Sequence, residues 1–109
     1  RKTGKKVSVR SPKDIAARYI PLMQNLRQEE FRIIILNNSN YVERDVLISK
    51  GHLTASLVHP REVFKMAIAE SAAGIILLHN HPSGNPKPSP DDISITRKMV
   101  EAGKLMEVP

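Results

Sequence analysis

The sequence contains no cysteine and no tryptophan, and aromatic residues make up only 4% of its 109 residues. Without cysteine the chain can form neither a disulfide nor a thiolate site, so any metal must rest on histidine and carboxylate side chains. The longest apolar run, residues 72–78, is far shorter than the ~20 residues that a membrane span needs. A secretory signal pattern is also missing. We therefore expect a small cytoplasmic domain without membrane contact, whose core is packed by aliphatic residues.

Positive charge is concentrated at the N-terminus. The formal net charge is +6, and residues 1–10 carry five Lys or Arg and no acid. The remaining residues carry 12 basic and 11 acidic side chains and are nearly neutral. Such an arm can contact a nucleic-acid backbone, although a solvated linker is the simpler explanation. Because the chain opens with Arg1, we expect a piece of a longer protein: an arm or linker over residues 1–10 and one domain over residues 11–109, truncated at its C-terminal end.

Hydrophobic periodicity predicts alternating helices and strands. A helix is expected from Pro12 to about residue 27, with positions 15, 19, 22 and 26 on its buried face. Strands are expected over residues 31–36, 41–48, 53–58 and 75–78. A second helix should begin at Pro60 and end at Gly74. A third should begin at Ser89 or Pro90 and bury positions 93, 96, 100 and 103. This order predicts a three-layer α/β/α domain with its site after the last strand.

The segment 79–92 reads HNHPSGNPKPSPDD and carries the most specific pattern. In an extended segment His79 and His81 face the same side, because side chains two residues apart do so. Asp92 belongs to the first turn of the third helix and can return to the same point. Two imidazoles and a carboxylate are three protein ligands of the kind a catalytic zinc uses, with a fourth position left for water. The pattern therefore predicts a zinc site and hydrolytic chemistry.

The same residues also have a structural explanation. Residues 89–92 are typical of a helix start, with serine as N-cap and acids in the first turn. The two explanations are compatible, because a capped helix is a rigid support for Asp92. His52 and His59 are interpreted as structural or surface residues. His59 or Arg61 would support the site only if it lay near the pocket.

A zinc-bound water also needs a general base. Glu29 and Glu30 directly precede the strand predicted at Phe31, where a carboxylate can lean over a neighbouring strand end. They could equally be the polar end of the preceding helix. The spacing alone does not choose between the two glutamates.

Taken together, these residues resemble a known family. His79-x-His81, seven residues, Ser89, two residues and Asp92 resemble the JAMM (MPN+) metalloprotease signature, which is found in deubiquitinating enzymes and related isopeptidases. The segments HNHPSG at 79–84, VHPREV at 58–63 and AAGIILLH at 72–79 are more closely similar to the bacterial RadC family. The resemblance extends over nearly the whole chain from about Ser11 onward.

The resemblance implies a mixed sheet with flanking helices, related to that of cytidine deaminases. It also implies one Zn²⁺ held by His79, His81 and Asp92, with Glu30 as general base because it directly precedes Phe31. Ser89 would stabilise the oxyanion. The function implied is hydrolysis of amide or isopeptide bonds in a peptide substrate.

The alternative is a DNA-associated binding module with a structural or vestigial metal site. It would use the basic arm or a helix-hairpin-helix region upstream, although the DNA-repair role in the family's name has no other support in these residues. A nuclease would need more carboxylates, and a deaminase would need cysteine ligands.

Overall fold

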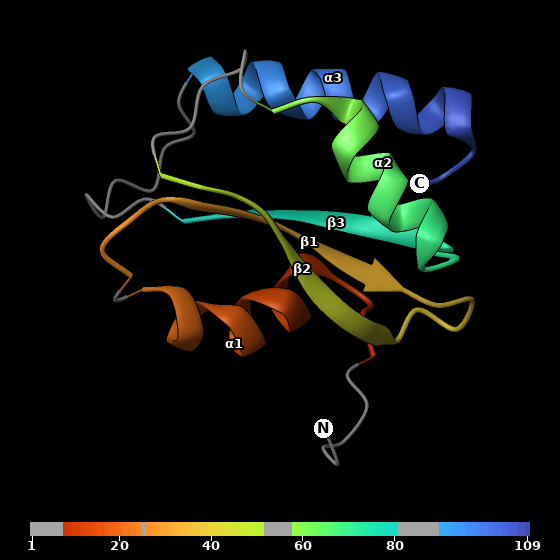
Figure 1. Ribbon diagram of the computed structural model, residues 1–109. Helices are drawn as coiled ribbons and strands as arrows, with labels where there is room; N and C mark the ends of the chain where they lie inside the picture. Colours follow the sequence, from red (N-terminus) through yellow and green to blue (C-terminus); the bar gives the residue numbers. More distant parts are fainter. Residues whose placement is uncertain (1–7, 25, 52–57, 81–89) are drawn as a thin grey trace.

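The computed structural model describes residues 8–24, 26–51, 58–80 and 90–109 (Figure 1). Within them the element order is α1 (Pro12–Met23), β1 (Glu30–Leu36), β2 (Val42–Lys50), α2 (Pro60–Ala69), β3 (Gly74–His79) and α3 (Pro90–Met106). The strands form one sheet in the order β2-β1-β3. The chain is thus a small α/β domain with β1 in the centre of its sheet.

Every strand pairing in the described part of the chain is antiparallel. β1 pairs with β2 through a short hairpin and with β3 along its other edge. The mixed sheet that the resemblance implied is therefore not formed by these residues. The reason is topological: β2 and β3 run in the same direction, but the connection through α2 places β3 on the far side of β1. The two strands that could pair in parallel are never neighbours.

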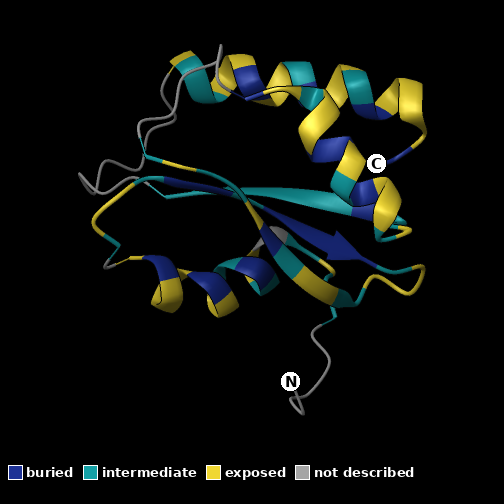
Figure 2. Cartoon of the chain, viewed as in Figure 1, coloured by how far each residue is buried: buried dark blue, intermediate teal, exposed yellow. Residues whose placement is uncertain are grey.

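Alternation along β1 divides the core into two clusters, and the strand itself is buried along most of its length (Figure 2). Phe31, Ile33 and Ile35 pack with residues of α2 and α3. Ile34 and Leu36 pack with residues of α1. Helix α1 consequently covers one face of the sheet, and α2 and α3 cover the other (Figure 1). The side chains of neighbouring residues in β1 therefore point to opposite faces of the sheet. This alternation determines which residues near the start of β1 can contact the end of β3.

Helix α1 is shorter than predicted and buries a slightly different face. It ends at Met23, and Met23 joins Ile15 and Tyr19 inside, whereas Leu22 is 65% exposed. The buried positions are spaced by four residues, so the contact stripe passes through position 23 instead of 22. The predicted extension to residue 27 does not form.

Helix α3 begins as predicted but is rotated relative to expectation. Its buried residues are Ile95, Met99 and Gly103, whereas Ile93 and Val100 are exposed. Gly103 allows a close approach, because a Cβ there would lie 2.6 Å from the carbonyl oxygen of Val108. The C-terminal segment therefore selects the face of α3 that turns inward.

The second helix begins at Pro60 as predicted, but it ends at Ala69 and not at Gly74, which is the first residue of β3, and Ile68 points outward. The strand before His79 forms where the sequence predicts it. The strand expected over residues 53–58 lies outside the described residues except for Val58, which is buried. Among the helices that the structure describes, none has both the length and the apolar character required to cross a membrane.

Candidate functional site

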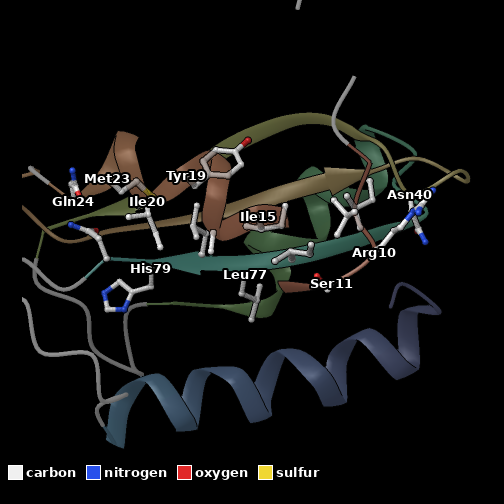
Figure 3. A pocket seen from close by; sticks show the side chains of 16 residues that line it. Arg10, Ser11, Ile15, Tyr19, Ile20, Met23, Gln24, Asn40, Leu77 and His79 are labelled. Carbon is white, nitrogen blue, oxygen red and sulfur yellow. The ribbon is translucent and has the colours of Figure 1, made fainter. Parts of the chain in front are cut away.

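His79 is the last residue of β3 and lies opposite Phe31 of β1. Side chains alternate along β3, so His79 shares a face with Ile75 and Leu77, which pack against the cluster formed with α2 and α3. Figure 3 shows the side chains of Leu77 and His79 on the side of β3 that faces α3. The imidazole is 15% exposed. The strand thus delivers a largely buried histidine to the start of α3.

Asp92 meets this histidine from the first turn of α3. Its Oδ1 lies 2.9 Å from Nδ1 of His79, and its side chain is 14% exposed. The helix start holds the carboxylate in place, and negative charge is stabilised there by the helix dipole. The structure therefore brings together two of the three residues predicted to hold a metal.

Glu29 approaches the other nitrogen of the same ring. Its Oε2 lies 3.4 Å from Nε2 of His79. The imidazole is consequently placed between two carboxylates, one from the segment before β1 and one from α3. Such a grouping can exchange protons with a substrate held beside it.

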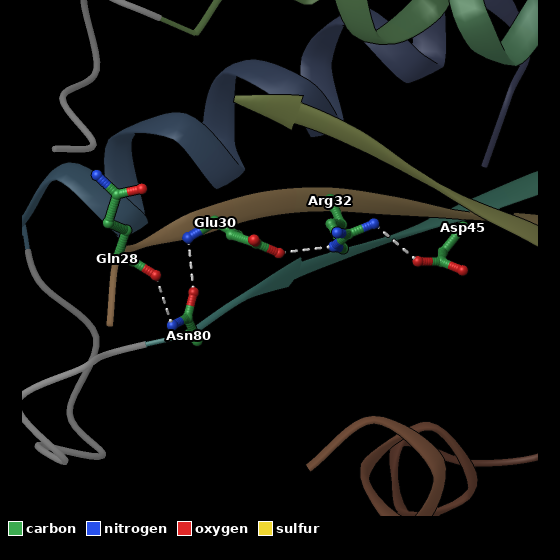
Figure 4. Close-up of polar contacts among 5 residues, drawn as sticks. All are labelled: Gln28, Glu30, Arg32, Asp45 and Asn80. Carbon is green, nitrogen blue, oxygen red and sulfur yellow. Dashed lines mark hydrogen bonds and ion pairs between the residues drawn. The ribbon is translucent and has the colours of Figure 1, made fainter. Parts of the chain in front are cut away.

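Glu30 lies on the opposite face of the sheet. Its Oε1 accepts a hydrogen bond of 2.9 Å from Nε of Arg32, and Nη1 of Arg32 contacts Oδ2 of Asp45 at 3.0 Å (Figure 4). The Glu30 side chain is only 8% exposed. It therefore belongs to an ion-pair network beneath α1 and not to the surroundings of His79.

The structure thus places Glu29 beside His79, and it places Glu30, which the resemblance implied as the general base, on the other face of the sheet. The physical reason for the place of Glu30 is strand alternation, because Phe31 faces α3 with His79 and its neighbour Glu30 must face away. Glu29 precedes the strand and reaches His79 on the side of Phe31.

Several of the other residues that the sequence predicted for the site are not among the described residues. His81 and Ser89 lie outside the described residues, as does His52. His59 is an exposed residue at the N-cap of α2, in keeping with a surface role, and Arg61 is exposed as well. Of the basic arm only residues 8–10 are described, and there the amide of Val9 donates to the carbonyl of Asn40 at 2.8 Å.

The donor chemistry of the described residues fits zinc. An imidazole nitrogen and a carboxylate oxygen are two of its usual ligand types, and His79 and Asp92 present one each at close range. In the described part of the chain, no group of three His, Cys, Asp or Glu side chains is arranged as a metal site. The third predicted ligand, His81, comes two positions after His79 in the sequence and lies outside the described residues.

A cavity of about 660 Å³ lies between α1 and β3 (Figure 3). Its walls are mainly apolar and include Ile15, Tyr19, Ile76 and Leu78, with His79 at one end. None of the described residues that line it is acidic. Because the imidazole of His79 points toward α3, this cavity and the carboxylates around the imidazole lie on different faces of the sheet.

The fold and this grouping define a small α/β domain with a histidine–carboxylate site at the end of an edge strand. Comparison with known families identifies the domain more closely. Residues 9–109 match the family model described as a RadC-like JAB domain. The chain belongs to this family, as its motifs at 58–63, 72–79 and 79–84 predicted.

Individual relatives agree with the family model. The chain is 46% identical over 109 residues to a UPF0758 protein of Salinibacter ruber, which covers 100% of this chain and 47% of the relative. It is 48% identical over 103 residues to a UPF0758 protein of Methanosarcina barkeri, covering 94% of this chain and 45% of the relative. A UPF0758 protein of Moorella thermoacetica is 49% identical over 100 residues, covering 92% and 44%. The chain thus spans about half the length of the curated relatives that it matches.

Proposed function

We propose that this domain is a zinc-dependent hydrolase of amide or isopeptide bonds in a peptide substrate, of the JAMM type. The observation that carries the proposal is the position of His79, whose two ring nitrogens face Asp92 and Glu29. Membership of the RadC-like JAB family supports it. We also propose a three-layer, cytidine-deaminase-like arrangement, supported by helices on both faces of the sheet (Figure 1).

His79 and Asp92, together with His81, would hold the zinc ion. When bound, zinc supplies a Lewis acid that polarises a carbonyl and lowers the pKa of a bound water toward ~7. Glu29 accepts the proton of the attacking water and transfers it to the amine that leaves. The hydroxyl of Ser89 donates a hydrogen bond to the tetrahedral oxyanion. Ser89 directly precedes α3 in the sequence, and the dipole of a helix is positive at its N-terminal end.

The metal part of the proposal is tested by elemental analysis of the purified protein. We expect about one zinc per chain in the wild type and a loss of most of it in His81→Ala. His59→Ala is the matched control, because His59 is exposed and outside the ligand set. Equal zinc content in wild type and His81→Ala would reject the site.

The catalytic part is tested by comparing Glu29→Gln with Glu30→Gln on a panel of fluorogenic amide- and isopeptide-linked peptides. Removing a general base should lower the rate by about 10²–10⁴-fold, so we expect this loss for Glu29→Gln. Glu30→Gln should retain most of the rate, provided that its thermal unfolding shows a folded protein. The reverse result would restore Glu30 as the base, and a zinc-loaded wild type without any hydrolysis would reject the hydrolase.

A further inference from the structure

Asn80 connects two segments that are fifty residues apart in the chain (Figure 4). Its Oδ1 accepts a hydrogen bond of 2.6 Å from the amide of Glu30. Its Nδ2 donates one of 3.1 Å to the carbonyl of Gln28. A single side-chain amide therefore binds the backbone on both sides of Glu29.

A third contact fixes the backbone of Glu29 itself. The carbonyl of Glu29 accepts a hydrogen bond of 2.8 Å from the amide of Gly51, just beyond the end of β2. The segment that enters β1 is consequently held from both neighbouring strands, by Asn80 after β3 and by Gly51 after β2. Holding the backbone at three successive residues restricts the directions in which the Glu29 side chain can point.

The location of Asn80 links this restraint to the metal site. Asn80 follows His79 directly, so the end of β3 carries a predicted zinc ligand and also the group that holds the segment bearing Glu29. Any shift of β3 would move both together. The 3.4 Å separation between Glu29 Oε2 and His79 Nε2 is thus supported by the contacts of Asn80 and Gly51 with the segment that precedes β1.

We propose that Asn80 is a positioning residue, which sets the carboxylate of Glu29 against His79 through its paired hydrogen bonds to Gln28 and Glu30. This inference rests on the proposed function in that it takes Glu29 as the general base. The chemistry requires an amide: it needs an acceptor for the Glu30 N–H and a donor for the Gln28 carbonyl at the same time. Aspartate retains only the acceptor, and alanine retains neither.

Hydrogen exchange tests the restraint without any need for activity. In Asn80→Ala we expect exchange of the Glu30 amide to accelerate by about tenfold, as the loss of one hydrogen bond predicts. Asn80→Asp should leave that amide protected, because its carboxylate still accepts. An unchanged Glu30 amide in Asn80→Ala would overturn the proposal.

Asn37 offers a matched control at the other end of β1. Its Oδ1 accepts hydrogen bonds of 2.9 and 3.0 Å from the amides of Ser39 and Tyr41. Asn37→Ala therefore removes a similar pair of backbone contacts away from the site. It should accelerate exchange at Ser39 and Tyr41, leave the Glu30 amide protected and leave hydrolysis unchanged.

Kinetics test whether Asn80 acts through Glu29. We expect Asn80→Ala to lower kcat by about 10- to 100-fold with little change in KM and with zinc content retained. In a Glu29→Gln background the same substitution should change the residual rate by less than about twofold, because the group that it positions is already lost. An equal effect of Asn80→Ala in both backgrounds would show that it acts elsewhere and would overturn the proposal. Failure of the proposed function has a different signature, namely a rate that Glu29→Gln leaves unchanged.

Discussion

Nδ1 of His79 and Oδ1 of Asp92 lie 2.9 Å apart, so the end of β3 and the first turn of α3 are joined at one point. These two elements, on either side of residues 81–89, thereby present adjacent nitrogen and oxygen donors. If both are zinc ligands, removing the charge of Asp92 must weaken metal binding even when the shape of the side chain is kept.

Asp92→Asn should accordingly lower zinc affinity by at least about tenfold, measured by competition with a chromogenic chelator. Asp91→Asn is the control, because it removes the same charge from the same helical turn. Both variants lose a carboxylate near the helix N-terminus, so any effect of the dipole on folding is shared. If the two variants bound zinc equally well, Asp92 would not be a ligand.

Much of this arrangement could be predicted from the sequence, and the parts that could not have identifiable causes. The apolar run before His79 and the proline at residue 60 correctly predicted β3 and the start of α2. These signals are local. The choice between Glu29 and Glu30 depends on which face of the sheet each side chain reaches, and that depends on the pairing of Phe31 with His79, 48 residues away.

The inward face of α3 was missed for a similar reason. Two sets of positions fit a helical period: the predicted set 93, 96, 100 and 103, and the observed set 95, 99 and 103. Periodicity alone therefore does not decide which face of the helix is buried. The choice is made by the contact between Gly103 and Val108, which a sequence pattern does not contain. Tertiary contacts of this kind decide the rotation of a helix whose hydrophobic residues are not confined to one stripe.

The ion pair between Glu30 and Arg32 beneath α1 leads to a prediction about stability. Arg32→Ala leaves the Glu30 carboxylate, 8% exposed, without the guanidinium that contacts it at 2.9 Å. A buried charge that loses its partner is costly, and Arg32 itself is partly exposed, so we expect a loss of about 1–3 kcal/mol in the free energy of unfolding. Urea denaturation followed by circular dichroism measures it.

The control for Arg32 is Arg44, on the neighbouring strand β2. Arg44 pairs with Glu70 at 3.4 Å, and its side chain is 51% exposed. Exposed pairs contribute little, so Arg44→Ala should change the free energy of unfolding by less than about 1 kcal/mol. Similar losses for the two variants would show that the network beneath α1 has no special role in stability.

Tyr19 predicts how stability depends on alkaline pH. Burial, with a further contribution from the charge of Asp45, raises the pKa of the Tyr19 phenol above its ordinary value of 10.0, while Arg18 acts in the opposite direction. The folded state therefore holds the phenol proton more tightly than the unfolded chain does. This contribution to stability is complete below about pH 10 and is lost as the pH rises through the raised pKa.

Unfolding free energies measured across this alkaline range should therefore fall less steeply in Tyr19→Phe than in the wild type. Tyr41→Phe removes the other tyrosine of the chain. Phenolate absorbance in Tyr41→Phe follows Tyr19 directly and should show its titration displaced to higher pH. Identical slopes in wild type and Tyr19→Phe would contradict the prediction.

Gly103 gives the sharpest test of the packing of α3. Replacing glycine by alanine inside a helix ordinarily stabilises it by roughly 1 kcal/mol. Here the added Cβ would lie 2.6 Å from the carbonyl oxygen of Val108. That atom belongs to the backbone, so it cannot move aside as the end of a flexible side chain could. We therefore expect the opposite sign for Gly103→Ala, a destabilisation of about 1–3 kcal/mol, because the C-terminal segment must shift away from the helix.

Ser94→Ala, at an exposed position of the same helix, should be neutral or slightly stabilising in the same denaturation experiment. A Gly103→Ala variant as stable as Ser94→Ala would mean that Val108 does not pack against α3 at this distance.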